Sequence, residues 1–222
     1  MTLLGMDTST SAATACVLRA DGEIFEIAPP PARLRDPPAH ASELMPALAD
    51  VMAQAGVGWG DLDAIAVGIG PGTFTGLRIG LATARALGSA NGLPLRRVSS
   101  LAALAAGIEA PLRLPLVDAR RGELFGALYD GSERLWAPFA APPNELLERL
   151  RDGNFRPLAA GDGSVRFRGM LEEAGIQVPA DDSQAHVVRA LHVCRLGAEA
   201  ADEPPEAVLP DYLRDPDAKP QQ

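Results

Sequence analysis

A change of periodicity within the first hundred residues limits what this chain can fold into. Three short apolar runs come first, at residues 2–7, 13–19 and 20–27, and Asp21-Gly22 is a typical hairpin turn. Helical and strand-like patterns then alternate: helices are predicted at His40–Ala55, 75–90 and 99–108, and strands at 62–70 and 93–100. The order β-β-β-α-β-α-β-α predicts an α/β fold in which helices pack against a mixed sheet.

The second half of the chain is less regular. The patterns predict two strands joined around 118–122, a helix at 143–153, a strand and Gly-rich turn at 155–163, and helices at 165–175 and 183–201. We therefore divide the chain into an N-terminal lobe (1–107), a smaller C-terminal lobe (108–183), a last helix free to pack back on the first lobe (184–203) and an extended tail (204–222).

Composition and charge exclude several classes of protein. The chain has 222 residues, 47% of them hydrophobic, which is enough for a substantial core. A net charge of −9 argues against a broad electrostatic grip on nucleic acid by this chain alone. No apolar run approaches the roughly 20 residues of a membrane span, and Asp7 interrupts the opening run that a signal peptide would need. Cys16 and Cys194 have no CxxC context, so we expect a cytoplasmic protein.

The stretch GIGPGTFTGLRIG, residues 68–80, resembles a phosphate-binding loop that runs into a helix. A Walker loop requires a lysine, yet the only lysine of the chain is Lys219, and neither register of the glycines completes G-x-G-x-x-G. Backbone N–H groups at the helix start could still hold an anion, with Thr73 or Thr75 as the cap. A plain strand-turn-helix junction is the alternative.

Small residues recur at every fourth position of the helix that follows. Gly76, Gly80, Ala84 and Gly88 form one stripe, although each glycine inside a helix costs about 0.5–1 kcal/mol relative to alanine. Such a stripe lets another helix approach closely. The neighbouring element is either the first helix of the same lobe, whose apolar stripe includes Leu44 and Leu48, or a helix of a second chain.

Six segments occur in the order seen in one family. They are LLGMDTSTSAATACVL, HASELMPALADVM, LDAIAVGIGPGTFTGLRIGLATARAL, GLPLRRVSSLAALA, VDARRGELFGALYD and PDYLRD. On these segments the chain resembles the TsaB (YeaZ) family, which takes part in making threonylcarbamoyladenosine beside the anticodon of tRNA. The likeness is strongest up to Asp130 and returns at the C-terminal YLR. Gly126 departs from it, because an aromatic residue is common at that position.

The resemblance implies an ASKHA fold, the actin-like, Hsp70-like and ribonuclease H-like architecture of two lobes, each with a mixed sheet flanked by helices. It implies a non-catalytic subunit that binds and activates a TsaD-like catalytic subunit, is joined by a TsaE-like ATPase, and reaches tRNA only through the complex. On this reading Leu44, Leu48, Gly76, Arg78, Gly80 and Ala84 are the partner-binding residues, and self-association through the same face is an alternative when the chain is alone.

The resemblance also indicates where a nucleotide would lie. Nucleotide-binding relatives cradle phosphate with the Asp-Thr-Ser-Thr hairpin and a later Gly-rich turn, and the DARRGE segment opens the second lobe near the shared cleft. The residues near a nucleotide would be Asp7, Thr8, Ser9, Thr73, Asp118 and Arg120. A vestigial hairpin and an internal salt bridge are the alternatives. No cofactor is required by this chain, and ATP or ADP would bind at the partner interface.

A metal centre is not predicted. TsaD-like catalysis holds its metal with an H-x-x-x-H pair, and the matching place here reads His40-Ala-Ser-Glu-Leu44, so only His40 remains. The competing function is a stand-alone ASKHA-type ATPase or peptidase-like enzyme. It would require a complete phosphate or metal site.

Overall fold

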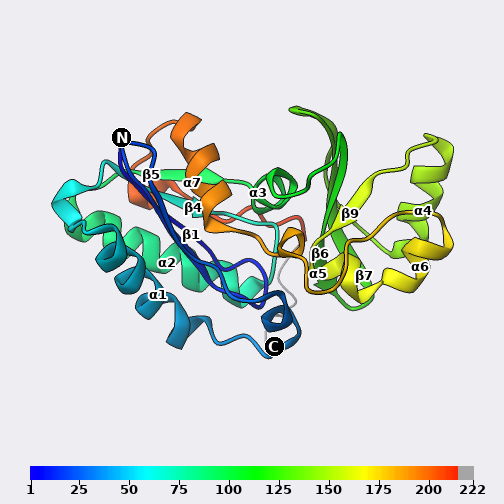
Figure 1. Ribbon diagram of the computed structural model, residues 1–222, viewed down its shortest axis with the longest axis horizontal. Coiled ribbons are helices and arrows are strands. Elements are labelled where there is room, and N and C mark those ends of the chain that lie inside the picture. Colours follow the sequence, from blue (N-terminus) through cyan, green and yellow to red (C-terminus); the bar gives the residue numbers. More distant parts are fainter. Residues whose placement is uncertain (215–222) are drawn as a thin grey trace, which may run out of the picture.

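The computed structural model describes residues 1–214, which form two α/β lobes, each built on its own sheet (Figure 1). The first lobe has a five-stranded sheet in the order β3-β2-β1-β4-β5. β1 pairs antiparallel with β2 and parallel with β4, so the predicted meander passes directly into a parallel unit and the sheet is mixed. The strands are β1 (Leu3–Asp7), β2 (Thr14–Leu18), β3 (Ile24–Ile27), β4 (Ala64–Gly68) and β5 (Leu95–Val98).

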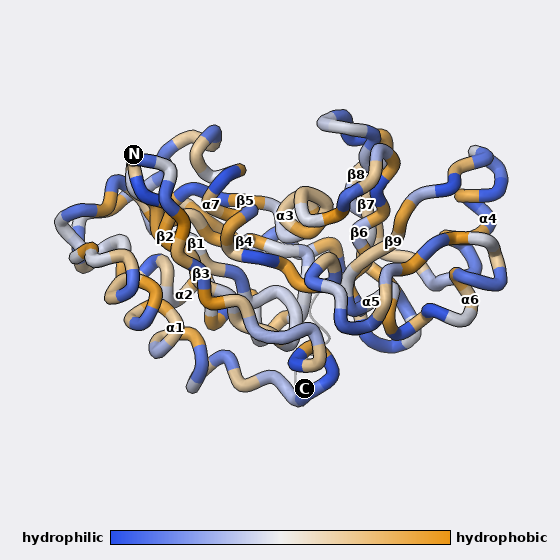
Figure 2. Tube along the Cα trace, viewed as in Figure 1, coloured by the Kyte–Doolittle hydropathy of each residue, from blue (hydrophilic) through white to orange (hydrophobic). Residues whose placement is uncertain are grey.

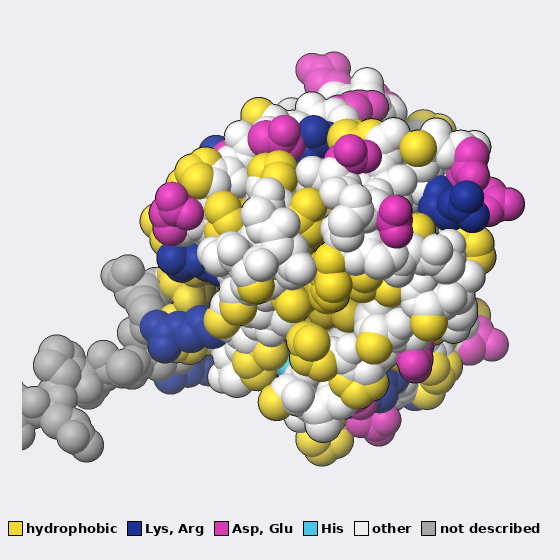
Figure 3. Space-filling model, turned by 90° about the vertical axis from the view of Figure 1, so that its left-hand side faces the viewer, with side chains coloured by type: hydrophobic (Ala, Val, Ile, Leu, Met, Phe, Trp, Pro, Cys, Tyr) yellow, Lys and Arg dark blue, Asp and Glu magenta, His cyan; other side chains and the backbone are white. Residues whose placement is uncertain are grey.

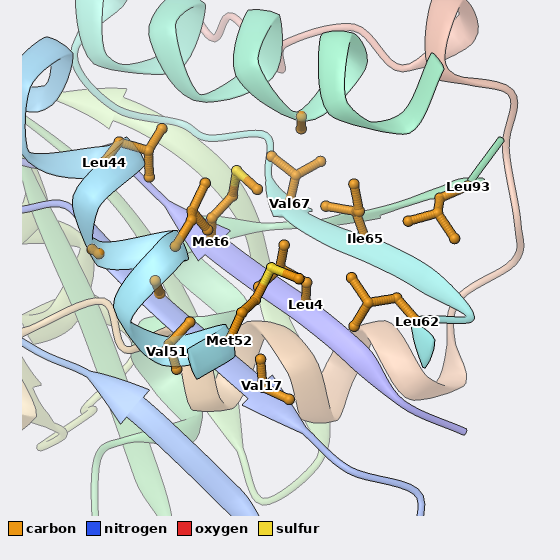
Figure 4. Packing of buried hydrophobic residues seen from close by; sticks show 14 of the residues in the cluster. Leu4, Met6, Val17, Leu44, Val51, Met52, Leu62, Ile65, Val67 and Leu93 are labelled. Atoms are coloured by element: carbon orange, nitrogen blue, oxygen red, sulfur yellow. The ribbon is translucent and has the colours of Figure 1, made fainter. Parts of the chain in front are cut away.

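Helices cover both faces of this sheet. α1 (His40–Ala55) and α2 (Phe74–Asn91) lie on one face, and α7 (Ala190–Glu199) lies on the other (Figure 1). Because side chains alternate along a strand, Leu4 and Met6 point toward α1 and α2, while Leu3 packs with α7. Figure 4 shows Leu4 and Met6 beside residues of α1, and Ile65 and Val67 beneath α2. Each such buried side chain stabilises the fold by about 1.5–3 kcal/mol.

The second lobe has a four-stranded sheet in the order β8-β7-β6-β9. β6 is parallel to β9 and antiparallel to β7, so this sheet is mixed as well. α3 (Ser100–Ala106) belongs to the first lobe by sequence but packs on β6 and β7, which places it between the lobes (Figure 1). The remaining elements are β6 (Leu112–Arg120), β7 (Glu123–Asp130), β8 (Glu133–Ala141), α4 (Pro143–Asp152), β9 (Leu158–Ala160), α5 (Asp162–Arg166) and α6 (Arg168–Glu173).

The predicted α/β, ASKHA-type architecture is confirmed, with three local differences. β8 is absent from the predicted order, and it is an edge strand that carries Pro138, a residue that weakens the strand signal in the sequence. The helix predicted at 165–175 is two short helices, because the backbone leaves helical geometry at Phe167 (φ −108°, ψ 21°).

The third difference is the last helix, which begins at Ala190 rather than near 183. Residues 184–186 form a 3-10 turn capped by Ser183, Val187 follows in an extended conformation, and both Val187 and Val188 are buried. The carbonyl of Val188 accepts a hydrogen bond from the Thr14 hydroxyl at 3.0 Å, which ties this segment to β2. α7 itself lies against β1, β2 and β4 of the first lobe.

The polar and apolar residues follow this layering. The central strands β1 and β4 are coloured apolar along most of their length, and polar residues gather in the loops (Figure 2). Within residues 1–214, no helix combines the length and apolar character needed to cross a membrane. Of the predicted tail 204–222, the part from 215 onward, which includes Lys219, lies outside the described residues.

Candidate docking surface and interlobe cleft

The Asp-Thr-Ser-Thr hairpin is buried, and the carboxylate of Asp7 accepts hydrogen bonds from groups of the same chain. Asp7 is 1% exposed; its Oδ1 accepts from the backbone N–H of Ser9 (2.7 Å) and from the Ser9 hydroxyl (2.6 Å), and its Oδ2 accepts from the Ser100 hydroxyl (2.6 Å). Burial raises the pKa of Asp7 above its usual value, although these hydrogen bonds act to lower it. Both carboxylate oxygens are therefore occupied by protein donors.

The Gly-rich turn closes over the same hairpin. Thr73 N–H donates to the carbonyl of Ser9 at 2.7 Å, and a Cβ built on Gly72 would lie 2.6 Å from the Ser9 Cβ. The two loops that would cradle phosphate in a nucleotide-binding relative are thus in direct contact. Asp7 and Ser9 do not reach the cleft, whereas Thr73 does.

The stripe of small residues in α2 faces this hairpin as well. The Thr8 hydroxyl donates to the carbonyl of Gly76 at 2.7 Å, and a Cβ on Gly80 would overlap the Thr8 Oγ1. The glycines are needed because the loop after β1 lies directly on the helix backbone. The close neighbour of Gly76 and Gly80 is therefore neither of the two helices considered from the sequence but the hairpin of the same chain.

Five of the six residues predicted to bind a partner are instead enclosed within the first lobe. Leu44 and Leu48 are 2% and 1% exposed, Ala84 is fully buried, and Gly76 and Gly80 are also buried. Their periodicity is explained by packing against the sheet and the hairpin of the same chain, which enclose these residues. Of the six predicted residues, only Arg78 is exposed.

The outer faces of α1 and α2 carry a second set of small and apolar residues. We call them the docking surface, and they follow the same four-residue spacing on the opposite side of each helix. Among the described residues of these helices, Asp50 and Arg78 are the only charged ones that are exposed. Figure 3 shows the end of the first lobe with apolar side chains across its middle and both acidic and basic side chains toward its edge. The docking surface consists of Ala41, Met45, Ala49 and Ala53 of α1 and Ala82, Ala86 and Ala90 of α2.

This surface could have been found from the sequence by asking which helix face carries mostly small residues and no charged ones. Met45 is 48% exposed, which is unusual for a large apolar side chain. Alanine at 82, 86 and 90 repeats with the same period as Gly76, Gly80 and Ala84, so periodicity alone could not choose between the faces.

A cleft of about 500 Å³ separates the start of α2 from the second lobe. Thr73 and Phe74 line one wall, and Asp118 and Arg120 line the other. Arg120 (φ 63°) and its neighbour Arg121 (φ 54°) adopt the left-handed conformation at the tip of the β6–β7 hairpin. The Asp118 carboxylate accepts from the Arg120 N–H at 2.9 Å and so holds this turn.

The predicted pair Asp118 and Arg120 forms an internal ion pair and also borders the cleft. Asp118 Oδ2 lies 3.2 Å from Arg120 and 2.8 Å from Arg166. The Asp118 N–H donates to Asp162 at 3.0 Å, and burial, with a contribution from the charge of Asp118, raises the pKa of Asp162 to about 6. The cluster holds the hairpin to α5.

His40 lies at the start of α1 and is 2% exposed. Neither ring nitrogen makes a hydrogen bond within the described part of the chain, and burial is the main cause that lowers its pKa. Among residues 1–214, no three His, Cys, Asp or Glu side chains are arranged to hold a metal ion.

Comparisons of the sequence and of the structure with known proteins point to the same family. Residues 37–138 match the family model described as TsaD, tRNA N6-adenosine threonylcarbamoyltransferase. An uncharacterized Mycobacterium tuberculosis protein is 35% identical over 99% of this chain and 94% of its own length. The Bacillus subtilis tRNA threonylcarbamoyladenosine biosynthesis protein TsaB is 30% identical over 96% of this chain and 94% of its own. The crystal structure of Pseudomonas aeruginosa YeaZ superposes with a TM-score of 0.75 at 27% identity, covering 96% of this chain and 99% of that one.

These relatives match nearly the whole chain, and the two-lobed fold agrees with the YeaZ structure. The chain belongs to the TsaB (YeaZ) family.

Proposed function

We propose that this chain is a non-catalytic subunit of the tRNA threonylcarbamoyladenosine machinery, and that it binds and activates a TsaD-like catalytic subunit through its docking surface. The observation that carries the proposal is the exposed, nearly uncharged face of α1 and α2 in a chain whose relatives carry the TsaB name. Interface centres are depleted in charged residues, as this face is.

The small size of the exposed side chains fits a helical partner. Ala49, Ala53, Ala82 and Ala86 allow another helix to approach closely, and Met45 supplies an adaptable apolar contact. A TsaD-like chain is the partner we assign, because residues 37–138 match the TsaD family model and the two proteins would present related lobes to each other. A TsaE-like ATPase would join this pair, and tRNA would be contacted through the complex.

The alternative of a stand-alone ATPase or peptidase is less well supported. Asp7 already accepts three hydrogen bonds from protein groups, and Ser9 lies against Gly72 where phosphate would have to enter. His40 has no second histidine beside it at the spacing of a metal pair. Any nucleotide would instead use the interlobe cleft beside Thr73 and Arg120, at the edge of the partner interface.

The test places a charge on the docking surface. Ala49→Arg and Ala82→Arg change exposed residues, so the folded chain should keep its stability within about 0.5 kcal/mol. An arginine buried unpaired in an interface costs several kcal/mol, which corresponds to a loss of more than about 100-fold in affinity for the TsaD-like subunit. Affinity is measured by titration calorimetry with the purified subunit.

The matched control is Ala174→Arg on the second lobe, at an exposed alanine remote from α1 and α2, which should bind normally. Sedimentation of the isolated chain shows whether a second copy uses the same surface. Full affinity in both docking-surface variants would refute the assignment. Tight ATP binding and turnover by the isolated chain would favour the enzyme instead.

A further inference from the structure

Residues 208–214, which we call the strap, leave the first lobe after a buried anchor. The Val208 side chain is fully buried in the core of that lobe. The Asp211 N–H then donates to the carbonyl of Ile69 at 2.9 Å, just beyond the end of β4. The start of the strap is therefore fixed to the first lobe by both its backbone and a side chain.

The other end of the strap is bound to the second lobe. The Arg214 guanidinium lies 2.6 Å from the Glu123 carboxylate and donates to the carbonyl of Ala119 at 3.1 Å. Leu213 packs on the apolar cluster that includes Val98 of the first lobe and Phe125 of the second. The strap thus spans the cleft and ends on the β6–β7 hairpin.

The middle of the strap stacks on the first turn of α2. The Tyr212 ring lies 5.2 Å from the Phe74 ring, and the Arg78 guanidinium lies 3.8 Å from the centre of the same ring. The Arg78 Nε also donates to the Tyr212 hydroxyl at 3.4 Å. Arg78 is one turn before Ala82, so the strap borders the docking surface along α2.

The strap adds exposed apolar area at that border. Leu209 is 61% exposed and Tyr212 is 37% exposed, and both are large apolar or aromatic residues of the kind enriched at interfaces. A chain covering Ala82 would meet Tyr212 only while Tyr212 is stacked on Phe74.

We infer that the strap is part of the interaction surface and couples partner docking to the closure of the two lobes. This inference rests on the proposed docking of a TsaD-like subunit. The partner binds the arrangement in which Tyr212 is stacked on Phe74, and because Leu213 and Arg214 follow directly in the chain, holding Tyr212 there also favours their contacts with the second lobe. A ligand that prefers one arrangement shifts the population toward it, so docking narrows the range of lobe positions.

The test measures the distance between the lobes in the full chain. Spin labels at Arg195→Cys on α7 and Glu148→Cys on α4 report on one lobe each, and both positions are exposed and remote from α1 and α2. Arg214→Ala and Glu123→Ala cut the same ion pair from opposite ends. Each should broaden the distance distribution and lengthen its mean, with little further change in the double variant. Arg97→Ala is the matched control, since it removes an ion pair to Glu203 of the same C-terminal segment within the first lobe.

The outcomes separate the strap from the proposed function. The inference is supported if both variants broaden the distribution, and if the purified TsaD-like subunit narrows the distribution of the wild-type chain but not that of the variants it still binds. An unchanged distribution in both variants refutes the role of the strap in holding the lobes together. A subunit that binds the wild-type chain without narrowing its distribution refutes the coupling alone. A wild-type chain that fails to bind the subunit refutes the proposed docking, and with it the coupling, whatever the distances show.

Discussion

Replacing Gly80 by alanine distinguishes internal packing from docking as the reason for the glycines of α2. If the stripe were an open surface, the change would stabilise the helix by about 1 kcal/mol, because alanine is the better helix former. The structure predicts the opposite sign. A methyl group on Gly80 would overlap the Thr8 Oγ1. Thr8 is 1% exposed, and its hydroxyl donates the 2.7 Å hydrogen bond to the carbonyl of Gly76.

The size of the effect follows from these contacts. Overpacking a buried site costs about 1–3 kcal/mol, and a buried hydroxyl that loses its acceptor costs about 1–3 kcal/mol more. After subtraction of the helix-propensity gain of about 1 kcal/mol, Gly80→Ala should lower the free energy of unfolding by about 1–5 kcal/mol. In a Thr8→Ala background the obstructing atom is gone, so the same change should be neutral or stabilising by about 1 kcal/mol.

Urea unfolding followed by circular dichroism measures all four members of this double-mutant cycle. Ala82→Gly, at an exposed position of the same helix, is the control, and it should cost about 1 kcal/mol whether or not Thr8 is present. A Gly80→Ala variant more stable than wild type, or a cost that persists without the Thr8 side chain, would refute the reasoning.

Three further predictions concern the rest of the chain. Burial raises the pKa of Asp162 from a usual 3.8 to about 6, so the free energy of unfolding should fall as the pH rises from about 4 to 6 and the carboxyl ionises more readily in the unfolded chain. Asp162→Asn should remove this fall from a plot of stability against pH. Cys16 and Cys194 are buried, and burial raises the pKa of Cys194, so neither should react with a thiol reagent until the protein unfolds. A Cβ on Gly126 would lie 2.7 Å from the Phe139 ring; Gly126→Ala should cost about 1–3 kcal/mol in urea unfolding, and Phe139→Ala should relieve it.

The order of elements in the first lobe was predictable because each helix and strand has its own periodicity. α1 runs over the predicted residues His40–Ala55, and Gly56 ends it in the left-handed conformation. In the second lobe, β8 is an edge strand with Pro138 in it, and edge strands need no regular alternation. The start of α7 depends on the contact between Val188 and Thr14, which are 174 residues apart and which no local pattern reports.

The candidate site was only partly predictable for a related reason. Periodicity shows that a helix has two kinds of face, but it does not show which face the sheet covers. Thr73, Asp118 and Arg120 do lie at the cleft, whereas Asp7 and Ser9 are enclosed. Gly126 pairs with Phe139 of the neighbouring strand, and the Phe139 ring fills the space beside the glycine.

The contact between Ser9 and Gly72 has a consequence for how such a chain can evolve. A phosphate group could enter only if the hairpin and the Gly-rich turn separated, which would break the Thr73–Ser9 backbone hydrogen bond and the hydrogen bond from the Thr8 hydroxyl to Gly76. No single substitution accomplishes this, and every intermediate would carry an unsatisfied buried group. The contact between the two loops therefore opposes a return to nucleotide binding. Binding at this place would require several substitutions together.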